Sequence, residues 1–140
     1  MTKEDIARVQ ATWHTIEPVK RIAAELFYVK LFELDATLKL LFSDDLQQRE
    51  QKFLQLVDAT VQGLEYTDAM MAAMRELGIR HPLFGDSEEH HGTVAAALFW
   101  TLEKCLRKEF TEEVRASWAR GFELLSQAMR ALPWAAPQAA

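Results

Sequence analysis

The sequence contains little of what a β-rich, disulfide-bonded or membrane-spanning protein needs. Its 140 residues include only five glycines and four prolines, so the many turns of an all-β fold lack their usual residues. Cys105 is the one cysteine, which excludes an internal disulfide framework and suits a reducing compartment. No apolar run approaches the ~18 residues of a membrane span, and the N-terminus lacks a signal-peptide pattern. We therefore expect a helical, cytoplasmic protein with no membrane partner.

The net charge and the length of the chain exclude further classes of protein. A formal net charge of −5 gives no general attraction to nucleic acid. We expect one globular domain over residues 1–132 and a short, disordered tail over residues 133–140, which are small and rich in alanine. The sequence has no glycine-rich phosphate loop and no metal-binding spacing such as CxxC or HExxH.

Apolar side chains recur at three- and four-residue steps, which is the period of an amphipathic helix. The predicted helices span residues 3–16, 19–34, 35–42, 46–64, 67–81, 87–108 and 112–132. Ser43, Asp44 and Asp45 are all candidate caps for the fourth helix, and Thr111 caps the last one. Since bundles prefer helices of matched length, the very short third helix favours a sandwich of crossed helices.

A histidine ends the apolar face of the predicted helix 67–81. Met71, Met74 and Leu77 precede His81, and the four residues share an arc of roughly 120°; Pro82 then blocks further regular helix. An imidazole that faces an apolar cavity can hold haem iron from one side. From this stretch alone, a core histidine with a satisfied hydrogen bond is the commoner alternative.

Two further polar side chains fall on inward faces. Tyr28 lies near the centre of the apolar stripe of helix 19–34, where its hydroxyl either reaches a backbone carbonyl or donates into a cavity. The stripe of helix 46–64, extended by one turn, includes Arg49, which either reaches past the stripe to solvent or guards the mouth of a pocket. Since each such group costs desolvation, the coincidence of Tyr28, Arg49 and His81 indicates a cavity with its own chemistry.

With these residues in place, the chain resembles a globin, and specifically a bacterial single-domain haemoglobin, similar to flavohaemoglobin haem domains and neuroglobin. The matching stretches are LFYVKLF (26–32), LKLLF (38–42), KFLQLVDATVQGLE (52–65), ELGIRH (76–81) and LEKCLRKEFTEEVRASW (102–118). The pattern LGxRH, followed by Gly85, resembles the proximal-histidine corner of the family. The resemblance implies an all-α globin fold, a three-over-three helical sandwich around haem b. It also implies that the helix between the third helix and the distal helix is absent.

The resemblance assigns roles to individual residues. His81 corresponds to the proximal ligand of the haem iron, and is the one metal ligand that we expect. Tyr28 corresponds to a position beside the distal, ligand-binding side, and Arg49 to the position that a distal histidine or glutamine usually occupies. The other positions expected to contact the haem are Phe42, Phe53, Met74, Leu77, Val94 and Leu98.

The sequence also departs from the family pattern. Without a distal histidine, an iron held by two histidines is less expected than in neuroglobin. His91 stands where flavohaemoglobins have a tyrosine that supports the proximal histidine. Their late glutamate, which polarises that histidine, falls near Pro133 and is missing, which weakens the case for peroxidase-like chemistry.

The function that this resemblance implies is reversible binding of dioxygen, or of carbon monoxide or nitric oxide, at a haem iron with an open sixth position. Tyr28 and Arg49 would stabilise the bound gas. An enzymatic alternative is nitric oxide dioxygenation, which needs an external reductase. Two further alternatives are a gas-sensing globin and a globin-like module that has lost haem.

Overall fold

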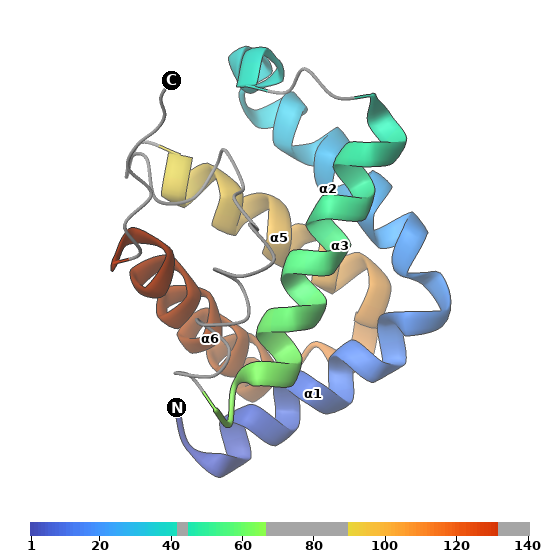
Figure 1. The fold of residues 1–140 in the computed structure, drawn as a ribbon. Helices are drawn as coiled ribbons and strands as arrows, with labels where there is room; N and C mark the ends of the chain where they lie inside the picture. The colour runs from blue at the N-terminus through green and yellow to red at the C-terminus, as the bar shows by residue number, and fades with distance from the viewer. Residues whose placement is uncertain (42–44, 67–89, 132–140) are drawn as a thin grey trace.

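The computed structural model describes residues 1–41, 45–66 and 90–131, and within these ranges it contains helices and turns but no strand. Several predicted features lie outside the described residues: helix 67–81 with Met74, Leu77 and His81, residue Phe42, and the tail 133–140. The described helices α1, α2, α3, α5 and α6 are arranged as crossed pairs rather than as a parallel bundle (Figure 1).

Helix α1 spans Lys3–Ile16, as predicted, because both of its ends are specified locally. Thr2 and Asp5 form a capping box, in which each side chain accepts a hydrogen bond of 3.0 Å from the other's backbone N–H. At the other end, Pro18 lies in the short 3₁₀ turn Glu17–Val19, where the α-helical pattern stops.

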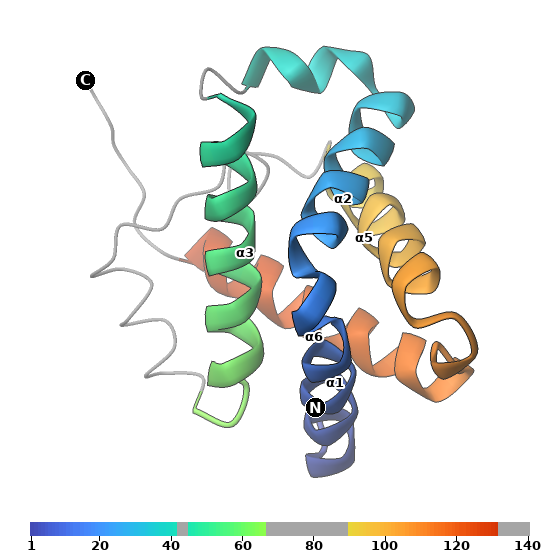
Figure 2. The same ribbon diagram turned by 90° about the vertical axis from the view of Figure 1, so that its right-hand side faces the viewer.

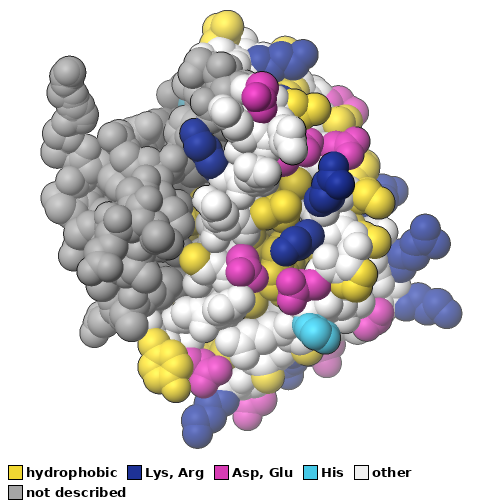
Figure 3. Space-filling model, turned by 45° about the vertical axis from the view of Figure 1, so that its right-hand side comes forward, with side chains coloured by type: hydrophobic (Ala, Val, Ile, Leu, Met, Phe, Trp, Pro, Cys, Tyr) yellow, Lys and Arg dark blue, Asp and Glu magenta, His cyan; other side chains and the backbone are white. Residues whose placement is uncertain are grey.

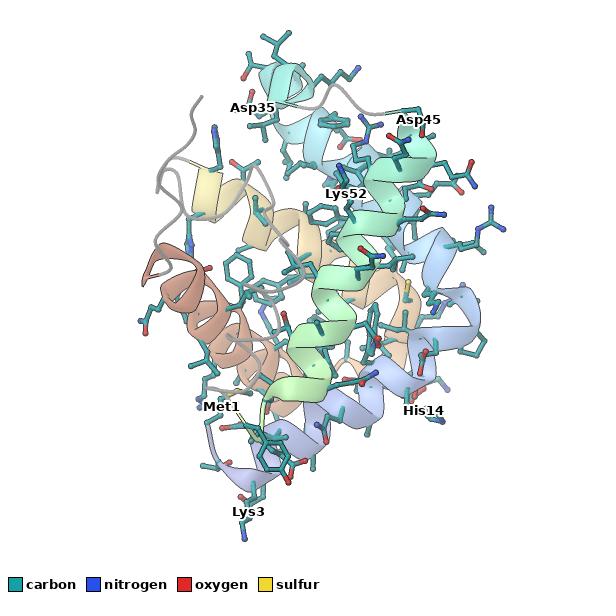
Figure 4. The ribbon with its side chains drawn as sticks, in the orientation of Figure 1. Met1, Lys3, His14, Asp35, Asp45 and Lys52 are labelled. Carbon is teal, nitrogen blue, oxygen red and sulfur yellow. The ribbon has the colours of Figure 1, made fainter. Side chains whose placement is uncertain are left out.

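Helix α2 spans Lys20–Leu34, the 3₁₀ helix η2 spans Ala36–Leu41, and α3 spans Leu46–Gly63. The predicted ends were correct to within one residue. Asp45 caps α3, since its Oδ1 accepts a hydrogen bond of 2.8 Å from the Gln48 backbone N–H (Figure 4). Four residues, 42–45, lie between the end of η2 and the start of α3.

Helix α5 spans His91–Leu106, and α6 spans Glu112–Ala131. Our prediction that α5 would reach Lys108 was wrong, because the chain leaves α-helical geometry at Arg107, whose φ is +53°. A 3₁₀ turn, Arg107–Glu109, follows. Thr111 caps α6 as predicted: its Oγ1 accepts a hydrogen bond of 3.2 Å from the Val114 backbone N–H.

Two pairs of helices form the frame: α2 packs against α5, and α1 packs against α6, which it crosses (Figure 2). Helix α3 contacts both α1 and α2. One apolar cluster lies between α1, α3, α5 and α6, and includes Trp13 and Trp118, whose rings meet edge to face at 6.3 Å. The second cluster joins α2, α3 and α5. Each large side chain buried in them contributes ~1.5–3 kcal/mol.

A buried carboxylate fastens α1 to α6. Asp5 is only 2% exposed, and its Oδ1 accepts hydrogen bonds of 2.8 Å from Ser117 Oγ and from Arg120 Nη1. The Thr2 backbone N–H, followed by the Ser117 hydroxyl, holds the pKa of Asp5 well below its usual range. Among the helices that the structure describes, none is long and apolar enough to cross a bilayer.

Candidate functional site

An aromatic cluster surrounds Tyr28 on the inner side of α2 and α3. Tyr28 is 2% exposed, and its ring centroid lies 5.1 Å from Phe27, 5.8 Å from Phe32 and 5.7 Å from Phe53. Phe27 and Phe53 stack at 4.2 Å with 16° between their planes. We call Phe27, Tyr28, Phe32 and Phe53 the aromatic cluster. Three of these rings come from α2 and one, that of Phe53, comes from α3.

The Tyr28 hydroxyl donates a hydrogen bond to the backbone carbonyl of Arg49, with an O···O distance of 3.4 Å. From the sequence we considered two roles for this hydroxyl, a bond to a backbone carbonyl or donation into a cavity. This contact is the first of them. An O–H···O bond of good strength measures ~2.5–3.0 Å, so a bond of 3.4 Å is a weak one.

The guanidinium group of Arg49 lies against the aromatic cluster. Its Cζ is 5.1 Å from the ring centroid of Tyr28 and 5.1 Å from that of Phe32, within the ~6 Å reach of a cation–π contact. The side chain is half-buried. The guanidinium therefore lies over the rings of Tyr28 and Phe32, and the role of Arg49 at the mouth of a pocket stays a prediction.

The structure brings four of the predicted site residues into one apolar cluster from three helices. Tyr28, Phe53 and Val94 are buried members of that cluster, and Leu98 packs against it half-buried. Leu98 also lines a small apolar cavity of about 40 Å³ that reaches Phe122 on α6. The other predicted site residues, Phe42, Met74, Leu77 and His81, lie outside the described residues.

One contact near this cluster was not predicted. His91 Nε2 lies 2.6 Å from Glu123 Oε1, and the His91 ring centroid is 4.9 Å from that of Phe122. The sequence had indicated that the family's late glutamate is missing near Pro133, yet a glutamate from an earlier turn of α6 reaches His91. Spacing along the chain gives no signal for this pair, because the contact depends on how α5 and α6 approach each other.

Comparison with known proteins gives the class of this fold and site. The chain matches the Globin family over residues 25–129, which is more than half of its length. It therefore belongs to the globin family, and the predicted family and all-α globin fold are confirmed.

Individual relatives are distant. The flavohemoprotein of Vibrio cholerae is 24% identical over 130 residues, covering 91% of this chain, which spans only 33% of that protein. The neuroglobins of Danio rerio and Chaenocephalus aceratus are each 21% identical over 143 residues, covering 92% of this chain and 90% of theirs. A crystal structure of the closed form of the HGbRL globin domain shares 32% identity. It aligns over 93% of this chain and 94% of that one, with a TM-score of 0.42.

Proposed function

We propose that this globin reversibly binds dioxygen at a haem b whose iron is held by His81, with Tyr28 and Arg49 on the distal side. Membership of the globin family supports a haem cofactor and a gaseous ligand. The roles that we propose for Tyr28 and Arg49 rest on the surroundings of these two side chains. One buried hydroxyl and one guanidinium lie on an otherwise apolar aromatic cluster contributed by α2 and α3.

The chemistry of the described residues suits a haem. Phe53, Val94 and Leu98 offer apolar side chains from α3 and α5 to a flat, largely apolar ring. When bound, haem supplies an iron with one open side that takes a small gas. The apolar walls exclude water from that side, and this protects the reduced iron from oxidation.

Tyr28 is the hydrogen-bond donor of the proposed site. Its hydroxyl is held among three phenylalanine rings, and its bond to the Arg49 carbonyl is weak at 3.4 Å. A bound gas that carries partial negative charge can accept a hydrogen bond from this hydroxyl. Arg49 adds a positive charge at the same edge, which favours such a ligand further.

The likeness to a flavohemoprotein favours a second candidate, nitric oxide dioxygenation. In that reaction dioxygen and nitric oxide combine with one electron to give nitrate, and a separate reductase would supply the electron. Kinetics separate the two candidates. Sustained nitric oxide consumption with a reductase present supports the enzyme, whereas a single stoichiometric turnover supports dioxygen carriage.

Absorption spectra of the purified protein test the main proposal. We expect a haem spectrum that changes on reduction and again when carbon monoxide is added, as an open coordination position requires. A His81→Ala variant should lose haem or show an altered spectrum. A protein that stays colourless when haem is supplied, or a variant with an unchanged spectrum, would contradict the proposal.

A further inference from the structure

A second recess lies on the outer side of α3, where this helix meets α1 and the start of α2. It has a volume of about 360 Å³, and its lining includes the apolar side chains Trp13 and Leu54 and the charged side chains Lys20, Arg21, Glu50 and Asp58. On the face shown in Figure 3, apolar side chains form the floor of a hollow that is ringed by charges of both signs. We call this recess the outer cleft. Tyr28, Arg49 and Phe53 are not part of its lining, so it is separate from the proposed gas site.

Two of the four charges in the outer cleft are already engaged within the fold. Lys20 Nζ lies 3.9 Å from Glu17 Oε2. Asp58 Oδ1 accepts hydrogen bonds of 3.3 Å from Trp13 Nε1 and 3.1 Å from Gln62 Nε2. The ion pair and the hydrogen bonds give Lys20 and Asp58 partners within the protein. We therefore assign neither of them to a ligand.

The other two charges, Arg21 and Glu50, remain available. Among the residues that the structure describes, Glu50 Oε2 is buried and has no hydrogen-bond partner, and Arg21 has no hydrogen bond or ion pair. Burial raises the pKa of Glu50, the charge of Glu25 raises it further, and Arg49 and Arg21 only partly offset these effects. The buried Oε2 of Glu50 thus lacks a donor, while the exposed guanidinium of Arg21 lies in the same cleft.

We propose that the outer cleft binds a free α-amino acid with an apolar side chain. Its carboxylate would accept paired hydrogen bonds from Arg21, its ammonium group would donate to Glu50 Oε2, and its side chain would cover Leu54 and Trp13. A cation alone would make no use of Arg21, and an anion alone would leave the buried Glu50 Oε2 without a donor. The volume of about 360 Å³ is near the lower end of the ~300–1,000 Å³ of small-molecule sites, which suits a ligand of this size.

Titration calorimetry on the full, haem-loaded chain tests this proposal, with L-leucine, L-methionine and L-phenylalanine as probes. Two analogues of leucine serve as matched controls: 4-methylpentanoate lacks the ammonium group, and 3-methylbutylamine lacks the carboxylate. At least one amino acid should bind, and leucine should bind roughly tenfold more tightly than either analogue, as expected when a charged hydrogen bond is lost. The proposal is overturned if none of the three binds at ~10 mM, or if the analogues bind as well as leucine does.

Substitutions in the outer cleft test whether the amino acid binds there. Arg21→Gln and Glu50→Gln should each weaken amino-acid binding by about tenfold. Lys20→Gln is the matched control: it removes a charge from the same cleft, but one that Glu17 already engages, so affinity should change by less than about twofold. Thermal unfolding shows whether each variant is folded. Folded Arg21→Gln and Glu50→Gln proteins that bind as tightly as wild type would overturn the assignment.

Discussion

The Tyr28 hydroxyl is the group that we expect to slow the release of dioxygen. A Tyr28→Phe variant keeps the ring inside the aromatic cluster and removes only the donor. A hydrogen bond is worth about 1 kcal/mol net, so dioxygen should leave the variant roughly five- to tenfold faster. Flash photolysis and stopped-flow mixing measure this rate. Carbon monoxide release, which depends less on a donor, is the internal control, and an unchanged dioxygen rate would rule out the donor role.

Asp5 should make the stability of the protein depend on acid pH. Its pKa in the folded state lies below the ~3.9 of an unfolded chain, because the Thr2 amide, Ser117 and Arg120 stabilise the carboxylate. A group with a lowered folded-state pKa contributes its full stability above the unfolded pKa and loses it as the pH falls towards the folded value. Wild type should therefore have a higher Tm than Asp5→Asn near neutral pH, and the difference should shrink as the pH falls below about 4. A difference that is the same at all pH values would contradict this role.

At the scale of single elements, the cap of α3 holds the first turn of this helix, which includes Arg49. Asp45→Ala removes the acceptor for the Gln48 N–H and should cost about 1 kcal/mol of unfolding free energy. Because Arg49 lies in the same first turn, amide exchange there should also become faster. Asp45→Asn keeps a side-chain oxygen and should restore most of the loss. Urea unfolding and hydrogen exchange measure both effects, and equal stability of the alanine and asparagine variants would argue against the cap.

The ends of most helices could be predicted because local chemistry decides them. The capping residues Thr2 and Asp5 set the start of α1, and Pro18 lies where it stops. The end of α5 could not be read in this way. We predicted an end at Lys108, but the chain leaves α-helical geometry at Arg107 with a positive φ, which the apolar period does not encode.

For the candidate site, the sequence predicted which residues face inward but not which side chains they contact. The helical period alone predicted that Tyr28 and Phe53 lie on inward faces. Both are buried in the second apolar cluster. Where the Arg49 head lies could not be predicted, because a long, flexible side chain on that face can reach either the rings or the solvent. The pairing of His91 with Glu123 depends on the packing of two helices and has no counterpart in the sequence pattern.

At the scale of the whole molecule, haem should act as part of the fold. A ligand that binds only the folded state stabilises it by about 2.7 kcal/mol at a free concentration of 100 times Kd. This should raise Tm by on the order of 10 °C in a chain of this size. Calorimetric melting of the haem-free and haem-loaded protein measures the shift, and His81→Ala should lose most of it. Equal melting temperatures with and without haem would contradict this expectation.

The pairing of α1 with α6 has a consequence for how the protein is made. Asp5 is joined to Ser117 and Arg120, and the Trp13 ring meets that of Trp118. Translation produces α1 first and α6 last, so most of the chain must leave the ribosome before the first helix meets its partner. Until then the apolar face of α1 is a natural target for chaperones that guard nascent chains.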